Sequence, residues 1–229
     1  MNYLVSSIQQ DVRVAMDEDR DASALLEDAD TDALTLDDLI ESKIEDGVAL
    51  VIDAAPLNKL SGWTSVSTLP TFNDDLSGEV AIPDYCQRLL EVKASDWERP
   101  ARQFITPDDP LYVMQFGRWG GLKGSPERPV VCVLEEDSGQ GNILQFWRCK
   151  TASATLTLKY METAFISPNT SGNNYISIPM QCYRAAVYQI AALVAHVLGG
   201  SQAAQSLGVV SADLLGLQPL TNTNGNNQQ

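Results

Sequence analysis

The spacing of apolar residues changes twice along this 229-residue chain, and that change constrains the fold more than any other feature. Apolar residues recur at helical spacing from Leu36 to Ile52 and again over Gln181–Leu198. Between about Leu57 and Pro179 they occur in short, partly alternating segments bounded by turn residues, which is typical of strands. In a compact fold the terminal helices pack together, so we predict an α+β fold: a terminal helical bundle with an inserted β-rich lobe.

The same pattern predicts the domain boundaries. Residues 1–56 and 179–217 are expected to form the discontinuous helical bundle, and residues 57–178 the β-rich inserted lobe. Residues 218–229 are predicted to be a polar tail, because Thr221–Gln229 contains only Asn, Gln, Thr and Gly and lacks the apolar content that orders a segment.

Capping signals delimit the predicted helices. Tyr3–Met16 shows the single apolar face of an amphipathic helix. Thr35 is a predicted N-cap, because two aspartates follow in the first turn, where the helix dipole favours carboxylates. Pro56 ends this helix. Gly199-Gly200 ends the apolar C-terminal helix, and Ser201 is predicted to cap a last helix that runs to about Leu215.

The central region is predicted to hold five strands and one short helix. The predicted strands are Gly78–Pro83, Arg88–Ala94, Pro129–Leu134, Ile143–Arg148 and Ala154–Tyr160. Asp137–Gly141 resembles the loop of a hairpin that joins the strands containing Val130 and Leu144. Asp108–Phe116 is the predicted helix, with a proline near its first turn.

Negative charge is concentrated near the N-terminal end. Fourteen Asp or Glu and three Lys or Arg lie between Asp11 and Asp46, which gives a local net charge of −11 out of −15 for the chain. A surface this negative repels nucleic-acid phosphates and anionic lipid, and it favours basic protein surfaces or cations. One hypothesis is therefore a binding module that uses this acidic segment to capture cations or a basic partner.

Part of this acidic segment imitates a calcium-binding loop. The aspartates at the matching positions are Asp17, Asp19, Asp21 and Asp28. However, Ala22 occupies the sixth position, where the sharp turn of such a loop needs glycine. We interpret the segment as solvated acidic chain rather than as a metal site.

No catalytic, cofactor or metal site is predicted. The four cysteines form no closely spaced pair, and the single histidine, His196, has no metal ligand three or four residues away and no nucleophile with an orienting acid. We expect His196 to be packed and to cap the last carbonyls of its helix. Without a catalytic constellation, the chain is not expected to be an enzyme. It is also not expected to be a membrane protein, because no apolar run reaches the ~18 residues that span a bilayer. The N-terminus lacks a basic region followed by an apolar block, so we expect no signal peptide.

Six residues of the central region are candidates for contacts with a partner. They are Trp97, Arg99, Arg118, Trp119, Lys123 and Arg128. Trp and Arg are the residue types that most often dominate binding energy at protein interfaces. For Trp97 two interpretations stay open: an interface residue, or a side chain that covers the core of its own lobe.

Several segments, taken in chain order, resemble a structural protein family of tailed bacteriophages, particularly phages of Bacteroides-type hosts and crAss-like phages. The matching segments are Asp30–Ile40, Ser42–Asp46, Ala54–Pro56, Gly78–Asp84, Ser95–Pro100, Asp109–Tyr112, Arg118–Val131 and the helix from Cys182. Proteins of this kind are virion components, and the helix–β–helix order is similar to neck proteins of the portal vertex.

The resemblance implies a function through assembly. It implies a head-to-tail connector (an adaptor or tail-tube ring, twelve-fold by analogy) that contacts the portal protein and adjacent neck or tail proteins. DNA would pass through the ring without sequence-specific binding, because contacts to phosphate need Lys or Arg, whereas an acidic lining lets DNA slide. The expected location is the neck or tail region of the virion, after assembly in the cytoplasm of the host bacterium. The family supplies no catalytic residues.

Overall fold

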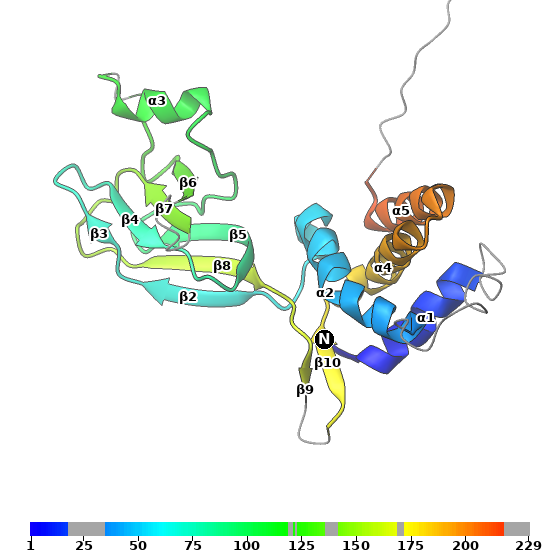
Figure 1. Cartoon of the computed structure of the whole chain (residues 1–229). Coiled ribbons are helices and arrows are strands. Elements are labelled where there is room, and N and C mark those ends of the chain that lie inside the picture. Colours follow the sequence, from blue (N-terminus) through cyan, green and yellow to red (C-terminus); the bar gives the residue numbers. More distant parts are fainter. Residues whose placement is uncertain (18–34, 119–120, 122, 136–141, 169–171, 218–229) are drawn as a thin grey trace, which may run out of the picture. The chain divides into compact units, whose positions relative to one another are not determined.

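The structure is a computed structural model that describes residues 1–17, 35–118, 121, 123–135, 142–168 and 172–217 (Figure 1). It contains both helices and antiparallel sheets, which confirms the mixed α+β class. The chain divides into two compact units. Met1–Gly62 and Ala164–Gln229 make the first, here called the helical unit, and Trp63–Thr163 makes the second, the β unit.

The helical unit is organised around one apolar helix. Its helices are α1 (Val5–Asp17), α2 (Leu36–Ala54), α4 (Tyr183–Val197) and α5 (Ser201–Leu215). Helix α4 packs against α1, α2 and α5, and eight of its fifteen residues are buried, five of them alanines. Because alanine side chains are short, neighbouring helices approach α4 closely on several sides.

The closest approach is between α2 and α4. Gly47 of α2 is buried, and a Cβ atom added there would lie 2.5 Å from Ile190 Cγ1 and 3.3 Å from Ile190 Cα. Only glycine leaves room for the α4 backbone at this distance. The isoleucines and valines of α2 that flank this contact are also buried, so the face that the sequence pattern predicted to be apolar is the packed one.

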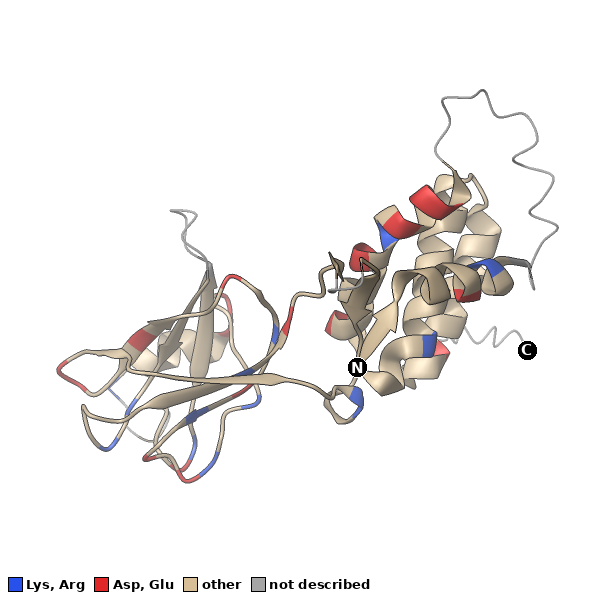
Figure 2. Ribbon diagram, turned by 90° about the horizontal axis from the view of Figure 1, so that it is seen from below, with Lys and Arg blue, Asp and Glu red and all other residues tan. Residues whose placement is uncertain are grey.

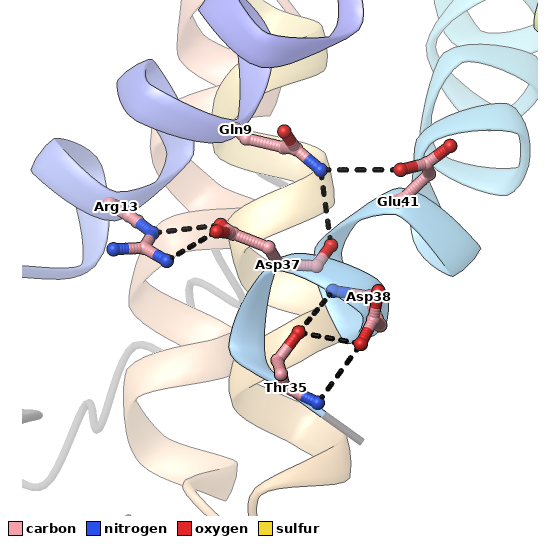
Figure 3. A network of polar contacts seen from close by, with 6 residues as sticks. All are labelled: Gln9, Arg13, Thr35, Asp37, Asp38 and Glu41. Atoms are coloured by element: carbon pink, nitrogen blue, oxygen red, sulfur yellow. Dashed lines mark hydrogen bonds and ion pairs between the residues drawn. The ribbon is translucent and has the colours of Figure 1, made fainter.

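Polar contacts join the end of α1 to the start of α2 (Figure 3). Thr35 and Asp38 form a capping box, in which the Thr35 hydroxyl accepts from the Asp38 N–H and the Asp38 carboxylate accepts from the Thr35 N–H. The predicted N-cap at Thr35 is therefore confirmed. Arg13 of α1 pairs with Asp37 at 2.7 Å, and the Gln9 amide donates to Glu41 at 3.4 Å. Both contacts join α1 to α2, and the Arg13–Asp37 pair, about half exposed, contributes about 1 kcal/mol or less.

A small antiparallel sheet completes the helical unit. Its strands are β1 (Asn2–Leu4), β10 (Asn174–Ser177) and β9 (Ser167–Pro168), in the order β1-β10-β9. Sequence analysis missed all three, because each is four residues or shorter and has no clear alternation. Since β10 pairs with β1, residues 164–178 belong to the helical unit, whereas we had expected the lobe to extend to residue 178.

Three details of the predicted helices are wrong. Helix α1 begins at Val5 rather than Tyr3, because Asn2–Leu4 is paired as β1. Gly200, not Ser201, is the N-cap of α5, and no side chain caps that helix end. His196 is exposed rather than packed. It lies in the last turn of α4.

The β unit consists of two antiparallel sheets around one core. One sheet has the order β2-β8-β5, with β2 (Thr64–Thr68), β8 (Leu156–Glu162) and β5 (Cys86–Ala94). The other has the order β3-β4-β7-β6, with β3 (Thr71–Phe72), β4 (Gly78–Ala81), β7 (Asn142–Phe146) and β6 (Val131–Glu135). Side chains of both sheets, among them Val80, Phe146 and Leu158, pack into one cluster of buried residues.

Five strands of the β unit occur where the sequence predicted them, with ends shifted by one or two residues. The expected β6–β7 pairing is confirmed, with Val133 opposite Leu144. The hairpin loop Asp137–Gly141 lies outside the described residues. Strands β2 and β3 were missed, because Thr64–Thr68 contains one apolar residue and β3 has only two residues. The short helix is present as α3 (Pro110–Phe116).

Replacing Gly47 with Ala tests the α2–α4 contact. Alanine is the better helix former by about 1 kcal/mol, but the added methyl group overlaps Ile190, and overpacking costs about 1–3 kcal/mol. We expect a net loss of unfolding free energy, measured by denaturant titration. Gly208→Ala in α5 is the matched control, because nothing lies within 4 Å of its added Cβ. It should stabilise the chain. Equal stabilisation by both variants would contradict the packing described here.

Candidate interaction surface

Helix α3 begins with strong local signals. The Asp109 carboxylate accepts from the Leu111 N–H at 2.8 Å, and Pro110 occupies the first turn, where its missing N–H costs nothing. The helix ends after Phe116, and the Gly117 N–H donates to the Met114 carbonyl. These caps explain why a seven-residue helix forms in a region otherwise built of strands and loops.

A small apolar cluster holds α3 on the β unit. Ile105, Cys132 and Trp147 are buried beneath the helix, and Tyr112 of α3 packs against them. The rings of Tyr112, Phe116 and Trp147 meet edge to face, with centroids 5.2–6.1 Å apart. Such aromatic pairs each add about 0.5–1.5 kcal/mol beyond the burial of their area. The inner side of α3 is therefore fixed.

Gln115 fastens the following loop to α3. Its side chain is 2% exposed and donates through Nε2 to the Leu111 carbonyl at 2.9 Å. Its Oε1 accepts from the Gly124 N–H at 2.7 Å. Gly124 is itself confined, because an added Cβ would lie 3.2 Å from Val130 and 3.3 Å from Trp147. A single buried amide thus positions both the helix and the loop.

The outward face of α3 is apolar. Val113 is 69% exposed and Phe116 60%, and Leu111 and Met114 are also exposed. The helix contains no charged residue, so its ribbon is neither blue nor red in Figure 2. Surface helices normally carry polar residues on their outer side, and clustered apolar side chains in such a position mark contact sites. We call Leu111, Val113, Met114 and Phe116 the α3 surface; the Phe116 ring also contacts Trp147 and so joins this surface to the aromatic cluster.

Basic residues border this surface in the chain. Arg118 follows α3 directly and is exposed, as is Arg128 at the far end of the loop, whereas Lys123 is half-buried. The Glu98 N–H donates to the Pro126 carbonyl at 2.9 Å, so the segment that carries the exposed Arg99 is tied to the same loop. The structure therefore connects four of the six predicted interface residues to one loop. Trp119 lies outside the described residues.

Trp97 is not an exposed interface residue. Its side chain is 3% exposed and belongs to the core of the β unit, with its ring edge to face against Phe146 at a centroid distance of 6.2 Å. The prediction of Trp97 as a partner contact is therefore wrong, and the alternative, a tryptophan that covers the core of its own lobe, describes its position. The neighbouring Asp96 carboxylate accepts from the Thr151 N–H at 2.9 Å, which ties this turn to the connection between β7 and β8.

The sequence analysis missed the α3 surface. It predicted the helix but not its exposure, because an apolar heptapeptide is equally typical of a buried segment. One feature of the sequence indicated this exposure: Pro110–Phe116 contains no charged residue, yet a helix of seven residues is too short to cross a core.

All four cysteines are free thiols, and burial raises the pKa of Cys86 and Cys132 to about 11 and that of Cys149 to about 12, far from thiolate reactivity. Among the residues that the structure describes, no three His, Cys, Asp or Glu side chains gather as metal ligands. Within the same residues, every helix is too short or too polar to cross a bilayer.

Comparison of the chain with models of known protein families and with curated proteins finds no match.

Replacing Gln115 with Leu tests the link between helix and loop. The variant leaves the buried Gly124 N–H without its acceptor, which should cost about 1–3 kcal/mol of unfolding free energy. Trypsin should also cut faster after Arg118 or Lys123, measured by mass spectrometry of timed digests. Gln103→Leu, at an exposed position, is the control. Unchanged stability and digestion in the Gln115 variant would show that the amide does not hold the loop.

Replacing Trp97 with Ala tests its role in the core. Removing a buried aromatic side chain costs about 3–5 kcal/mol, so the melting temperature should fall strongly. Trp63→Ala is the matched control, because Trp63 is exposed and its removal should change stability little. Comparable melting temperatures for the two variants would contradict the burial of Trp97.

Proposed function

We propose that the chain is a structural virion protein of a tailed phage that forms a neck or connector ring at the portal vertex. The observation that carries the proposal is the α3 surface: an apolar patch, held by Gln115 and the aromatic cluster and followed in the chain by a loop that carries basic residues. A surface of this kind binds another protein. The phage context comes from the resemblance of the sequence segments given above.

The uneven distribution of charge supports a head-to-tail arrangement of copies. The helical unit contains sixteen acidic and five basic residues, a net charge of −11, whereas the β unit contains fourteen acidic and ten basic residues, a net charge of −4. Red segments of α2 in Figure 2 belong to this acidic set. A contact between the basic border of the α3 surface and the acidic helical unit of the next copy joins different patches. Contacts of that type are heterologous and close into rings when the rotation permits.

The architecture fits the same role. In the proposal the terminal helices form a bundle and the β unit is the lobe inserted into it, as in connector rings. The acidic segment then lines or borders the channel, where it repels phosphate and lets DNA pass without binding. The portal protein and neighbouring neck or tail proteins are the proposed partners, and about twelve copies is the proposed ring size by analogy.

Light scattering tests this function through the α3 surface. The purified chain, alone or mixed with its candidate portal protein, should reach the mass of a ring of about twelve copies. Val113→Lys should abolish assembly, because it places a charge in the centre of the apolar patch, yet it should change the melting temperature little, since the side chain is exposed.

Ser153→Lys is the matched control, because it adds the same charge at an exposed position of the β unit outside the α3 surface. It should assemble normally. A wild-type chain that stays monomeric with and without the portal protein would overturn the proposal and favour the cation- or basic-partner-binding module.

A further inference from the structure

Strand β2 presents a sheet edge that no other described strand pairs with. It is the border strand of the sheet β2-β8-β5 and pairs only with β8, and it forms the lower margin of the β unit in Figure 1. Alternate residues of a border strand direct their backbone N–H and C=O groups away from the sheet. At five residues, β2 offers such groups over a longer stretch than the two-residue border strands β3 and β9.

The other long border strands of the β unit are covered. Strand β5 is bridged by Ala101 through hydrogen bonds in both directions with Val92, and β6 is bridged by Ile105. Strand β2 also lacks the features that normally protect an edge, which are lysine, proline or a bulge. No charged residue occurs from Leu60 to Phe72, although a fifth of the chain is charged. The β2 edge therefore has none of the features that keep another strand from pairing with it.

The sequence of β2 identifies the second strand. Thr64-Ser65-Val66-Ser67-Thr68 reads the same in both directions. Antiparallel pairing of two copies around Val66 places Thr64 opposite Thr68 and Ser65 opposite Ser67. Threonine pairs of this kind are among those that stabilise neighbouring strands. The strand is therefore complementary to itself.

The residues that flank β2 extend this match. Trp63 and Leu69 are both exposed, and strand periodicity places them on the same face as the exposed serines 65 and 67. In the register centred on Val66, Trp63 of one copy lies opposite Leu69 of the other, at both ends of the ladder. The charge distribution also favours this contact. A chain of net charge −15 repels its own copies, but the segment Leu60–Phe72 that would meet its own copy contains no charged residue.

We propose that two copies of the chain associate by antiparallel pairing of their β2 strands around a two-fold axis at Val66. This inference goes beyond the proposed ring function and does not depend on it, because it uses a different surface and a symmetric contact. A five-residue ladder with two apolar pairs is at the small end of protein interfaces, so the association is expected to be weak and reversible.

Two double variants test the pairing and its register. Ser65→Glu with Ser67→Glu places like charges opposite each other twice in the dimer. Ser65→Glu with Ser67→Lys places opposite charges there instead. Within one copy, both variants have Glu at position 65, opposite Lys159 of β8. Both also lose the hydrogen bond of Ser67 with Thr157, so the two variants are expected to have similar stability as monomers. Equal melting temperatures would verify this.

Sedimentation equilibrium at protein concentrations up to about 1 mM, where small interfaces associate, gives the readout. All chains carry Val113→Lys, so that contacts through the α3 surface are weakened equally. We expect a monomer–dimer equilibrium for the chain with native β2, at least tenfold weaker dimerisation for the Glu/Glu variant, and dimerisation restored to within threefold in the Glu/Lys variant.

Three outcomes would overturn the proposal: no dimer with native β2, a Glu/Glu variant that dimerises as well as native β2, or a Glu/Lys variant as weak as Glu/Glu. The first means that the edge has another occupant, and the third that the strands pair in another register or not at all. Failure of the ring proposal is seen separately, because it appears as unchanged assembly on adding Val113→Lys alone.

Discussion

The approach of α2 to α4 at Gly47 and Ile190 is the contact on which the helical unit depends. It joins a segment near the start of the chain to one near its end, across more than a hundred residues that belong elsewhere. Two helices this close exclude solvent from the faces that meet, and α2 buries three isoleucines and two valines along with the glycine. The β1–β10 pairing and the contacts of Arg13 and Gln9 with α2 add to the helical unit that the α2–α4 contact holds together.

The β unit tolerates being an insertion because of its topology. It begins with β2 and ends with β8, and these strands are hydrogen-bonded neighbours, with Thr64 opposite Tyr160. The chain therefore enters and leaves the unit at adjacent points, and the unit needs no contact with another part of the chain to close its own core. The same arrangement makes β2 a border strand, since its only partner within the unit is the strand by which the chain leaves.

Long periodic patterns were predictable from sequence and short elements were not. Helices α2 and α4 were found because many apolar residues repeat at one spacing, and Thr35 was recognised because its cap uses side chains that are specific to helix starts. Helix α5 was placed by a predicted cap at Ser201, although Gly200 is the N-cap. Strands β1, β9 and β10 have at most four residues, so their existence depends on distant pairing rather than on local pattern. Trp97 shows the same limit, because whether a tryptophan faces the core or the solvent is set by tertiary packing.

For the candidate surface, the sequence located the basic loop and the short helix before it, but not the exposure of that helix's apolar side chains. Composition shows that Pro110–Phe116 is apolar, yet only the structure shows that Tyr112 and Gln115 use one side of it and leave the other side uncovered. The two exposed features of the β unit also differ in the assemblies they permit. A β2–β2 contact around a two-fold axis uses the same strand in both copies and stops at two copies, whereas in the proposed ring the α3 surface meets a different patch of the next copy. Growth into a ring therefore requires the second kind of contact, and the first can only join copies in pairs.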